Sequence, residues 1–213
     1  MKTKRKKFPR IPHLSWSFGR LEDDIALNSI EQLQCLDDIV VTEKLDGENT
    51  TLYHDYLHAR SLDSKSHPSR DWIKHFHAGL KHDIPQDVRI CGENLYAKHS
   101  IFYDALTTYF YVFAIFQEDV CLSWDDTVEW CQLLGLETVP VLYRGKWDEA
   151  AIKACWTGKS VFGKEQEGYV VRNANHFKFE DFQQNIAKYV RADHVTTNRH
   201  WMHEIITPNQ LAA

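Results

Sequence analysis

The chain has 213 residues, of which 43% are hydrophobic, and its formal net charge at pH 7 is −5. This length and apolar content are typical of one globular domain and exclude a disordered chain. No apolar run reaches the roughly 18 residues that cross a bilayer, so we expect no membrane partner. The net charge does not by itself indicate a nucleic-acid partner, although basic residues cluster in the segment 2–10.

The five cysteines are widely spaced and form no C-x-x-C pair (Cys35, Cys91, Cys121, Cys131 and Cys155). Their odd number and spacing favour reduced thiols over a disulfide framework or a zinc site. The basic start, MKTKRKKF, leads into no apolar signal core, and no repeat or linker divides the chain. We therefore expect a cytoplasmic protein whose residues 1–213 form a single domain, with residues 1–10 as a flexible basic tail.

Short β-branched or apolar runs predict strands, and the segments between them predict helices. The strands are expected at 39–43, 50–56, 109–116, 138–143, 168–172 and 186–191. The helices are expected at 71–81, 124–134 and 148–156. Strands and helices that do not alternate regularly predict an α+β fold with mainly antiparallel sheets.

The helix boundaries rest on local signals. Trp72, Phe76 and Leu80 recur at four-residue steps and share one face of the first helix. Ser123 is a suitable N-cap for the second helix, and Gly135 follows its last turn. These signals predict amphipathic helices that pack on the sheets.

Lys44 lies at the end of the first predicted strand, in the segment Thr42-Glu43-Lys44-Leu45-Asp46-Gly47-Glu48-Asn49-Thr50. A strand end followed by an Asp-Gly turn would hold the lysine amine on a rigid element facing a cleft. Taken alone, the K-x-D-G pattern favours a plain hairpin, because Lys, Asp and Gly are common turn residues.

Five further segments follow Lys44 in order: Arg60-Ser61, Gly92-Glu93-Asn94-Leu95-Tyr96-Ala97, Tyr109 to Ile115, Glu167-Gly168-Tyr169-Val170-Val171-Arg172 and Ala187-Lys188-Tyr189-Val190-Arg191. In this order and spacing the set resembles the covalent nucleotidyltransferase superfamily of polynucleotide ligases and RNA capping enzymes. The Glu43–Lys44 pair and Asn49 resemble the RNA ligase branch most, the phage double-strand-sealing type in particular. The resemblance covers about residues 39–201.

This resemblance implies a nucleotidyltransferase fold, with antiparallel sheets around an ATP cleft. Lys44 would attack the α-phosphate of ATP, expel pyrophosphate and hold AMP through a phosphoramidate bond. A free lysine amine has a pKa of about 10.4, so we expect nearby cations in a desolvated cleft to lower it. Lys188 is the catalytic cation that the resemblance implies, and Arg191 is a second candidate.

The remaining implied roles concern the nucleotide and a metal. Glu93 would contact the ribose, Glu167 would bind Mg²⁺ or Mn²⁺, and Phe113 would stack on adenine. Asn49 and Arg60 would hold the nucleotide and the 5′-phosphate end. The other motif residues expected at the nucleotide are Glu43, Asp46 and Gly47. Singly, each of these residues is equally compatible with a surface ion pair, a turn or a core position.

The sequence departs from the family pattern at two positions. Ala114 stands where the family commonly has Asp, and Val190 stands where a second lysine of the last motif is expected. In a strand, Val190 shares the face of Lys188 and Arg191 points to the other face. Lys178 is an alternative source of the second cation.

Two other features have no assigned chemistry. His75 and His77 have no carboxylate or thiol partner at ligand spacing, so we expect exposed or core histidines and not a metal pair. The stretch 61–88 matches no motif, and an ordinary packing insertion is favoured over a lid or an RNA-contacting insertion.

The expected function is an ATP-dependent RNA ligase that joins a 5′-phosphate to a 3′-hydroxyl. The residues after Arg191 are too few for an appended OB-fold domain, so substrate contacts are left to this domain or to a partner protein. The alternatives are a minimal ATP-dependent DNA ligase, a GTP-using capping enzyme and a noncatalytic RNA-end-binding module. The intact set of Lys44, Glu93, Glu167 and Lys188 argues against the binding module.

Overall fold

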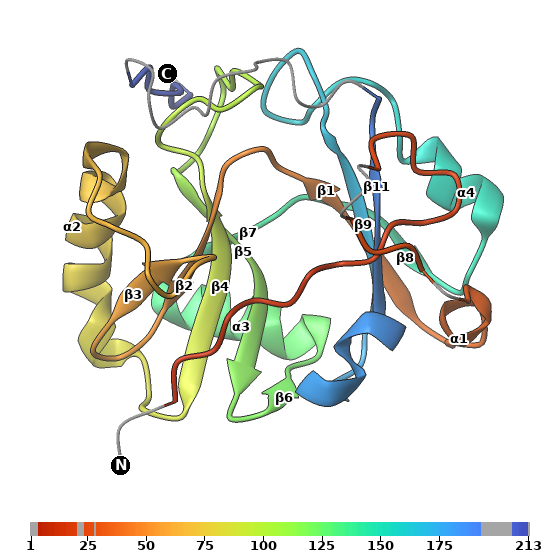
Figure 1. Cartoon of the computed structure of the whole chain (residues 1–213), viewed down its shortest axis with the longest axis horizontal. Helices are drawn as coiled ribbons and strands as arrows, with labels where there is room; N and C mark the ends of the chain where they lie inside the picture. The colour runs from red at the N-terminus through yellow and green to blue at the C-terminus, as the bar shows by residue number, and fades with distance from the viewer. Residues whose placement is uncertain (1–3, 21–23, 28, 193–205, 213) are drawn as a thin grey trace.

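The computed structural model describes residues 4–20, 24–27, 29–192 and 206–212. Two sheets stand side by side, with helices on their outer faces (Figure 1). The smaller sheet, here called sheet A, has four antiparallel strands in the order β11 (Ile186–Val190), β9 (Gly168–Asn173), β1 (Ile39–Lys44) and β8 (Val141–Gly145).

The larger sheet, sheet B, is also antiparallel along its main path. Its order is β10 (Phe177–Lys178), β6 (Val120–Cys121), β5 (Phe110–Gln117), β4 (Val88–Asn94), β2 (Glu48–Leu52) and β3 (Leu57–Ala59). The short strand β7 (Glu137–Thr138) pairs with β5 in parallel. The α+β fold with mainly antiparallel sheets is thereby confirmed.

The helices cover the sheets through apolar faces, as the four-residue spacing predicts. Against sheet B lie α2 (Asp71–Leu80) and α3 (Trp124–Leu134), whose Ile73, Leu80 and Cys131 belong to one core cluster. Against sheet A lie α1 (Glu31–Gln34) and α4 (Glu149–Ala154), with Leu33 and Ile152 in a second cluster. The remaining helices are single 3₁₀ segments: η1 (Pro68–Arg70), η2 (Lys81–Asp83) and η3 (Phe179–Gln184).

Local signals place both ends of α3 correctly, whereas the predicted helices 71–81 and 148–156 are longer than α2 and α4. The Ser123 hydroxyl accepts the N–H of Asp126 at 3.0 Å, and Gly135 adopts φ of 64°. The predicted strands 50–56 and 138–143 each run across a break, because a turn at Tyr53–Tyr56 separates β2 from β3 and Val139–Pro140 separate β7 from β8. The described residues contain no OB-fold barrel, and residues 193–205 of the tail lie outside them.

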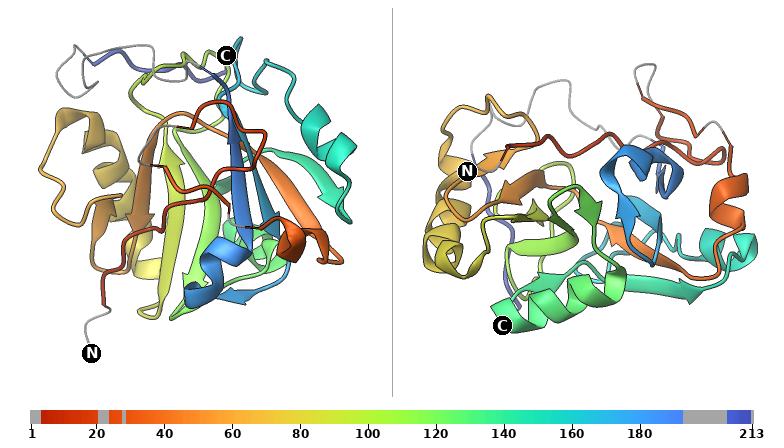
Figure 2. Two further views of the ribbon diagram at one scale, coloured as in Figure 1. Left: turned by 45° about the vertical axis from the view of Figure 1, so that its right-hand side comes forward. Right: turned by 90° about the horizontal axis from the view of Figure 1, so that it is seen from below.

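Residues 4–10 are not the flexible tail that their basic composition predicts. The segment Lys6–Leu14, here called the N-terminal strap, runs from sheet B to sheet A across the front of the molecule (Figures 1 and 2). At one end the N–H of Lys6 bonds the hydroxyl of Tyr53 at 3.0 Å. At the other, Lys188 donates its N–H to Pro12 O at 2.9 Å and accepts from Leu14 N at 2.8 Å. In the middle of the strap Phe8 is only 6% exposed, and burial of its apolar ring holds this part of the strap in place.

The segment 206–212 returns to the loop that follows β4. Asn209 is 1% exposed, donates to Leu95 O at 2.7 Å and accepts the N–H of Tyr103 at 2.9 Å. A buried amide that satisfies loop backbone groups is a rigid support. This support stabilises the loop against which the turn after Lys44 packs.

Candidate active site

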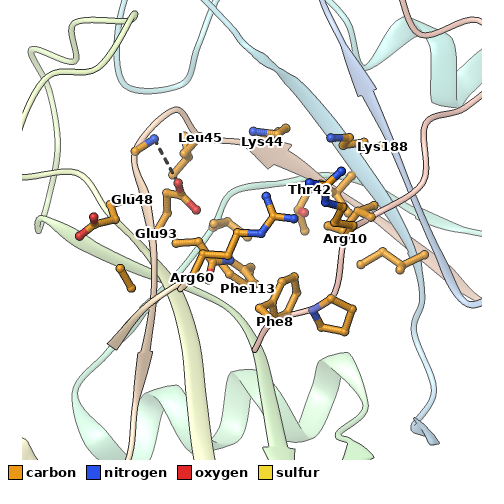
Figure 3. A pocket seen from close by; sticks show the side chains of 18 of the residues that line it. Phe8, Arg10, Thr42, Lys44, Leu45, Glu48, Arg60, Glu93, Phe113 and Lys188 are labelled. Atoms are coloured by element: carbon orange, nitrogen blue, oxygen red, sulfur yellow. Dashed lines mark hydrogen bonds between the residues drawn. The ribbon is translucent and has the colours of Figure 1, made fainter. Parts of the chain in front are cut away.

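A cavity of about 650 Å³ lies between the two sheets, under the strap (Figure 3). Its walls come from both sheets and from the strap, with Lys44 and Thr42 on β1, Glu93 on β4 and Lys188 on β11. A volume in this range matches small-molecule and cofactor sites. Of the residues that the sequence pattern singles out, the cavity is lined by Glu43, Lys44, Gly47, Asn49, Arg60, Glu93, Phe113 and Lys188.

Lys44 is the last residue of β1 and pairs with Gly168 of β9. At Gly168 an added Cβ would come within 2.0 Å of Tyr189 O, so close strand packing there requires glycine. The Lys44 Nζ lies 2.6 Å from Glu167 Oε2, and its side chain is 26% exposed. The nucleophile predicted from sequence thus has a short contact with one carboxylate and an open side toward the cavity.

The structure corrects the expectation that cations lower the pKa of Lys44. Burial alone lowers that pKa, but the carboxylates of Glu167, Glu93 and Asp46 together raise it above its ordinary value. Without ligands, therefore, Lys44 is an ammonium held by acidic neighbours. The amine becomes a nucleophile only after it loses this proton.

The carboxyl groups of Glu167 and Glu93 lie near Lys44 and are candidates to take up its proton. Burial raises the pKa of Glu167 to about 7, and Lys44 partly offsets the effect. Burial likewise raises the pKa of Glu93 to about 8, again opposed by Lys44. Buried acids with pKa values near neutrality are typical of sites that transfer protons or bind metal.

Carboxylate oxygens suit Mg²⁺ or Mn²⁺, but the protein alone does not complete a coordination shell. Within the described part of the chain, no group of three or more His, Cys, Asp or Glu side chains is placed to hold an ion. The carboxylates of Glu167 and Glu93 both raise the pKa of Lys44. Two carboxylates are too few ligands for a divalent ion, so a bound cation would need phosphate oxygens as further ligands. The residues fit a metal that arrives with a nucleotide.

The turn after Lys44 is held by side chains and close packing. Glu93 Oε1 accepts the N–H of Gly47 at 3.1 Å, and a Cβ on Gly47 would lie 2.6 Å from Asn94 O. Asp46 Oδ2 accepts the N–H groups of Ser100 and Ile101 at 2.7 and 2.8 Å. Asp46 therefore anchors a loop and, contrary to the sequence assignment, does not line the cavity.

Glu43 has a similar supporting contact. It is 2% exposed, and its Oε2 accepts the N–H of Val161 at 3.1 Å. Burial raises the pKa of this carboxyl group. Its Oε1 is buried and has no hydrogen-bond partner among the described residues, and Glu43 is one of the residues that line the cavity.

Phe113 is placed by a β-bulge. Gly92 pairs with Val112 and Cys91 pairs with Ala114, which leaves Phe113 between two paired positions. Such bulges redirect a side chain and are common beside active sites. Phe113 and Val170 both line the cavity, while Ala114 is 3% exposed in the core, so an aspartate at 114 would be buried.

Lys188 faces the cavity, as strand alternation predicts. Its Nζ lies 3.7 Å from Asp24 Oδ1, and its side chain is 18% exposed. Burial and the neighbouring Lys44 lower the pKa of Lys188. It is the cation that stands beside the nucleophile.

The two alternatives for the second cation lie elsewhere. Arg191 bonds Glu165 at 2.8 Å and does not line the cavity, so its sequence assignment to the nucleotide is not supported. Lys178 is 71% exposed and pairs with Glu180. The strap supplies Arg10 to the cavity, and β9 supplies the buried Arg172.

Several lining residues escaped sequence reasoning because they depend on long-range packing. Arg70 comes from the unassigned stretch 61–88 and binds Glu48 through two hydrogen bonds of 2.7 and 2.5 Å. Phe8 contacts Phe113 edge-to-face with ring centroids 4.9 Å apart. The basic composition of the N-terminus was the one available signal for the strap.

The histidine pair is not a metal pair. His77 is 6% exposed and bonds Tyr53 O at 2.6 Å, whereas the exposed His75 bonds Asp71 O at 2.7 Å. Burial lowers the pKa of His77. Both are structural side chains of α2.

In the described residues no helix has the length and apolarity of a bilayer span.

The site is a strand-end lysine beside buried carboxylates between two antiparallel sheets. Solved structures with a similar fold include RNA ligases. The family model "RNA ligase" matches residues 37–190, and the chain belongs to this family. A search of functionally curated proteins finds no significant match.

Three similar structures illustrate the shared fold. An archaeal ATP-dependent RNA ligase is 17% identical, with a TM-score of 0.57, and the match covers 88% of this chain and 48% of that one. The Naegleria gruberi RNA ligase with pyrophosphate is 19% identical, with a TM-score of 0.57 and coverages of 89% and 60%. A putative ATP-dependent DNA ligase from Aquifex aeolicus is 20% identical, with a TM-score of 0.52 and coverages of 87% and 50%. This chain thus spans about half to three-fifths of their lengths.

Proposed function

We propose that this RNA ligase family member is an ATP-dependent RNA ligase that joins a 5′-phosphate to a 3′-hydroxyl through a lysyl-AMP intermediate. The observation that carries the proposal is Lys44 Nζ at the end of β1, open to a 650 Å³ cavity and 2.6 Å from Glu167. Residues 1–213 would act as one adenylyltransferase domain, in the cytoplasm, where its free cysteines stay reduced. A partner protein could add substrate contacts.

In the first step Lys44 Nζ attacks the α-phosphorus of ATP. The N–P bond forms, the bond to the β-phosphate oxygen breaks, and pyrophosphate leaves with its electron pair. Before this attack the ammonium proton of Lys44 passes to Glu167, 2.6 Å away and with a pKa of about 7, and from there to solvent, which frees the amine and leaves the carboxylate ionised for a metal. Lys188 offsets the charge that develops on the phosphate oxygens.

The second step takes place at the AMP phosphorus, and the third takes place at the 5′-phosphorus of the RNA. The 5′-phosphate of RNA attacks the AMP phosphorus and breaks the N–P bond, which regenerates the amine. A 3′-hydroxyl then attacks the 5′-phosphorus of the adenylylated end, and AMP leaves. Phe113 and Val170 would enclose the adenine, Glu93 the ribose and Arg60 the 5′-phosphate, while Asn49 Oδ1, buried without a hydrogen-bond partner among the described residues, would accept from a substrate hydroxyl.

A divalent ion is part of the proposal. Glu167, with Glu93 close by, would bind Mg²⁺ or Mn²⁺ together with phosphate oxygens, and the ion would neutralise phosphate charge. The Naegleria gruberi enzyme has been solved with ATP and Mn as an E227A variant, with 18% identity to this chain. That likeness supports the choice of cofactors.

The test is incubation with α-labelled ATP and Mg²⁺ or Mn²⁺. We expect a label on Lys44 in the wild type and none in Lys44→Ala, with the fold of the variant checked by circular dichroism. A wild type that takes no label overturns the proposal and favours a noncatalytic RNA-end-binding module. GTP in place of ATP tests the capping alternative.

A minimal DNA ligase is the second candidate, favoured by the similarity to the Aquifex aeolicus protein. Matched nicked duplexes with RNA or DNA at the joined ends separate the two. Faster sealing of the DNA nick by the adenylylated protein would reverse our assignment.

A further inference from the structure

A second cavity of about 680 Å³ adjoins the first and also borders the strap. The two cavities share five lining residues, Phe8, Pro9, Arg10, Arg60 and Ser61, which form the connection between them. Lys7 lines only the second cavity, to which η3 contributes Phe179, Glu180, Phe182 and Gln183. The strap therefore lines both cavities, and only the first of them is lined by Lys44.

The connection is lined by positive charge. Lys7, Arg10 and Arg60 are exposed, and the sole acidic residue lining the second cavity is Glu180, which pairs with Lys178. Arg60 lies close enough to Lys188 to contribute to the lowered pKa of that lysine. In Figure 3 Arg60 enters from the side of sheet B and Arg10 from the strap. A cationic path leads from Lys188 past these arginines to Lys7.

The strap presents these cations on a fixed backbone. Hydrogen bonds to Tyr53 and Lys188 tie its two ends, and Phe8 packs against Phe182 with ring centroids 5.2 Å apart. Fixing a binding segment before the ligand arrives reduces the entropy lost on binding. A mobile basic tail, which the composition alone suggests, would lack this advantage.

From this geometry we propose that the strap and Arg60 form the binding track for the RNA strand that carries the 5′-phosphate. The inference rests on the proposed function, because it starts from the AMP phosphorus at Lys44. The terminal phosphate must reach that phosphorus, so the following phosphates of the same strand need a cationic exit. Arg60, Arg10 and Lys7 line such an exit, and the second cavity has room for the adjoining nucleotide.

The experiment compares Lys7→Ala with the wild type and with Lys146→Ala. The control removes the same charge at an exposed lysine that lines neither cavity, whereas Lys7 lines only the second one. Formation of lysyl-AMP is measured first without RNA, where all three proteins should match. Binding of a 5′-phosphorylated single-stranded RNA is then measured at several salt concentrations. Loss of one phosphate contact should reduce the slope of log affinity against log salt by about 0.7.

Strand identity is tested with preformed lysyl-AMP enzyme and a nicked substrate. The strap variant should transfer AMP several-fold more slowly at low RNA concentration and regain the wild-type rate at saturation. Replacing the 5′-phosphorylated strand by a 5′-mononucleotide should remove the difference, since a mononucleotide has no following phosphate that could reach Lys7. An unchanged salt slope overturns the proposal, as does a difference that disappears only when the 3′-hydroxyl strand is shortened. A wild type that forms no lysyl-AMP overturns the proposed function itself.

Discussion

Lys44 and Glu167 form a 2.6 Å ion pair at the point where β1 meets β9, with Glu167 only 8% exposed. The pair keeps Lys44 protonated and places a carboxylate in contact with its ammonium group. A nucleotide that arrives with a cation would compete for the same carboxylate. In the proposed mechanism, activation of Lys44 is thereby coupled to the arrival of ATP.

Glu167→Gln should make Lys44 more acidic. The pKa of Lys44 is raised by three carboxylates, and the substitution removes the one in contact. The reaction of Lys44 with an amine-selective reagent, followed by mass spectrometry from pH 7 to 11 without nucleotide, should therefore shift its midpoint to lower pH. Lys146, exposed and remote from the cavity, serves as the internal reference. A midpoint that does not move contradicts the electrostatic explanation.

Glu93→Gln should stabilise the protein, and more so at alkaline pH. Burial raises the pKa of Glu93 to about 8, so between its unfolded pKa near 4.3 and 8 the folded state binds more protons than the unfolded state. Wild-type stability attributable to this group is thus lost as pH rises through that window. We expect Tm to rise by about 3–6 °C at pH 8 for a gain of roughly 1–2 kcal/mol, and to change little at pH 5.

Thermal melts at both pH values check this expectation. Glu180→Gln is the control, because Glu180 is 75% exposed. An equal Tm change for Glu93→Gln at pH 5 and pH 8 would show that Glu93 does not bind its proton more tightly in the folded state.

Phe113→Leu should weaken use of ATP more than it weakens the fold. Stacking of a base on an aromatic ring is worth roughly 1–3 kcal/mol, so the apparent KM for ATP should rise about tenfold or more. Phe116→Leu is the matched control, since Phe116 lies on the same strand, is fully buried and does not line the cavity. If both variants lose Tm while keeping ATP affinity, Phe113 is a core ring.

Lys188→Ala should slow single-turnover formation of lysyl-AMP by about 100-fold or more, as expected when a cation is removed from developing charge. Arg191→Ala should cost less than tenfold, because Arg191 bonds Glu165 outside the cavity. Rapid-quench measurements with labelled ATP compare the two. The reverse order of effects would exchange their roles.

The parts of the fold that could be predicted are those that depend on residues close together in the sequence. The N-cap at Ser123, the apolar face of α2 and the strand that ends at Lys44 each depend on neighbours within a few residues. The strap could not be predicted, because Phe8 is ordered by rings contributed from β5 and η3. Its basic composition pointed instead to a solvated tail.

In the candidate site too, local signals could be read from the sequence and long-range contacts could not. Lys188 on β11 lines the cavity, whereas Arg191, one residue past the end of β11, does not. The motif Asp46 was assigned to the nucleotide, yet its carboxylate is used by the backbone of the loop at Ser100. The raised pKa of Lys44 was also missed, since the sign depends on how many carboxylates fold around the amine.

Because of the bulge, the direction of the Phe113 side chain does not depend on how the neighbouring residues of β4 and β5 pair. The pairs Gly92–Val112 and Cys91–Ala114 flank it on either side. Deletion of residue 113 would let these flanking pairs close into an uninterrupted ladder. The sheet can therefore gain or lose the cavity-facing ring by a single-codon insertion or deletion, while every other strand pair keeps its partner.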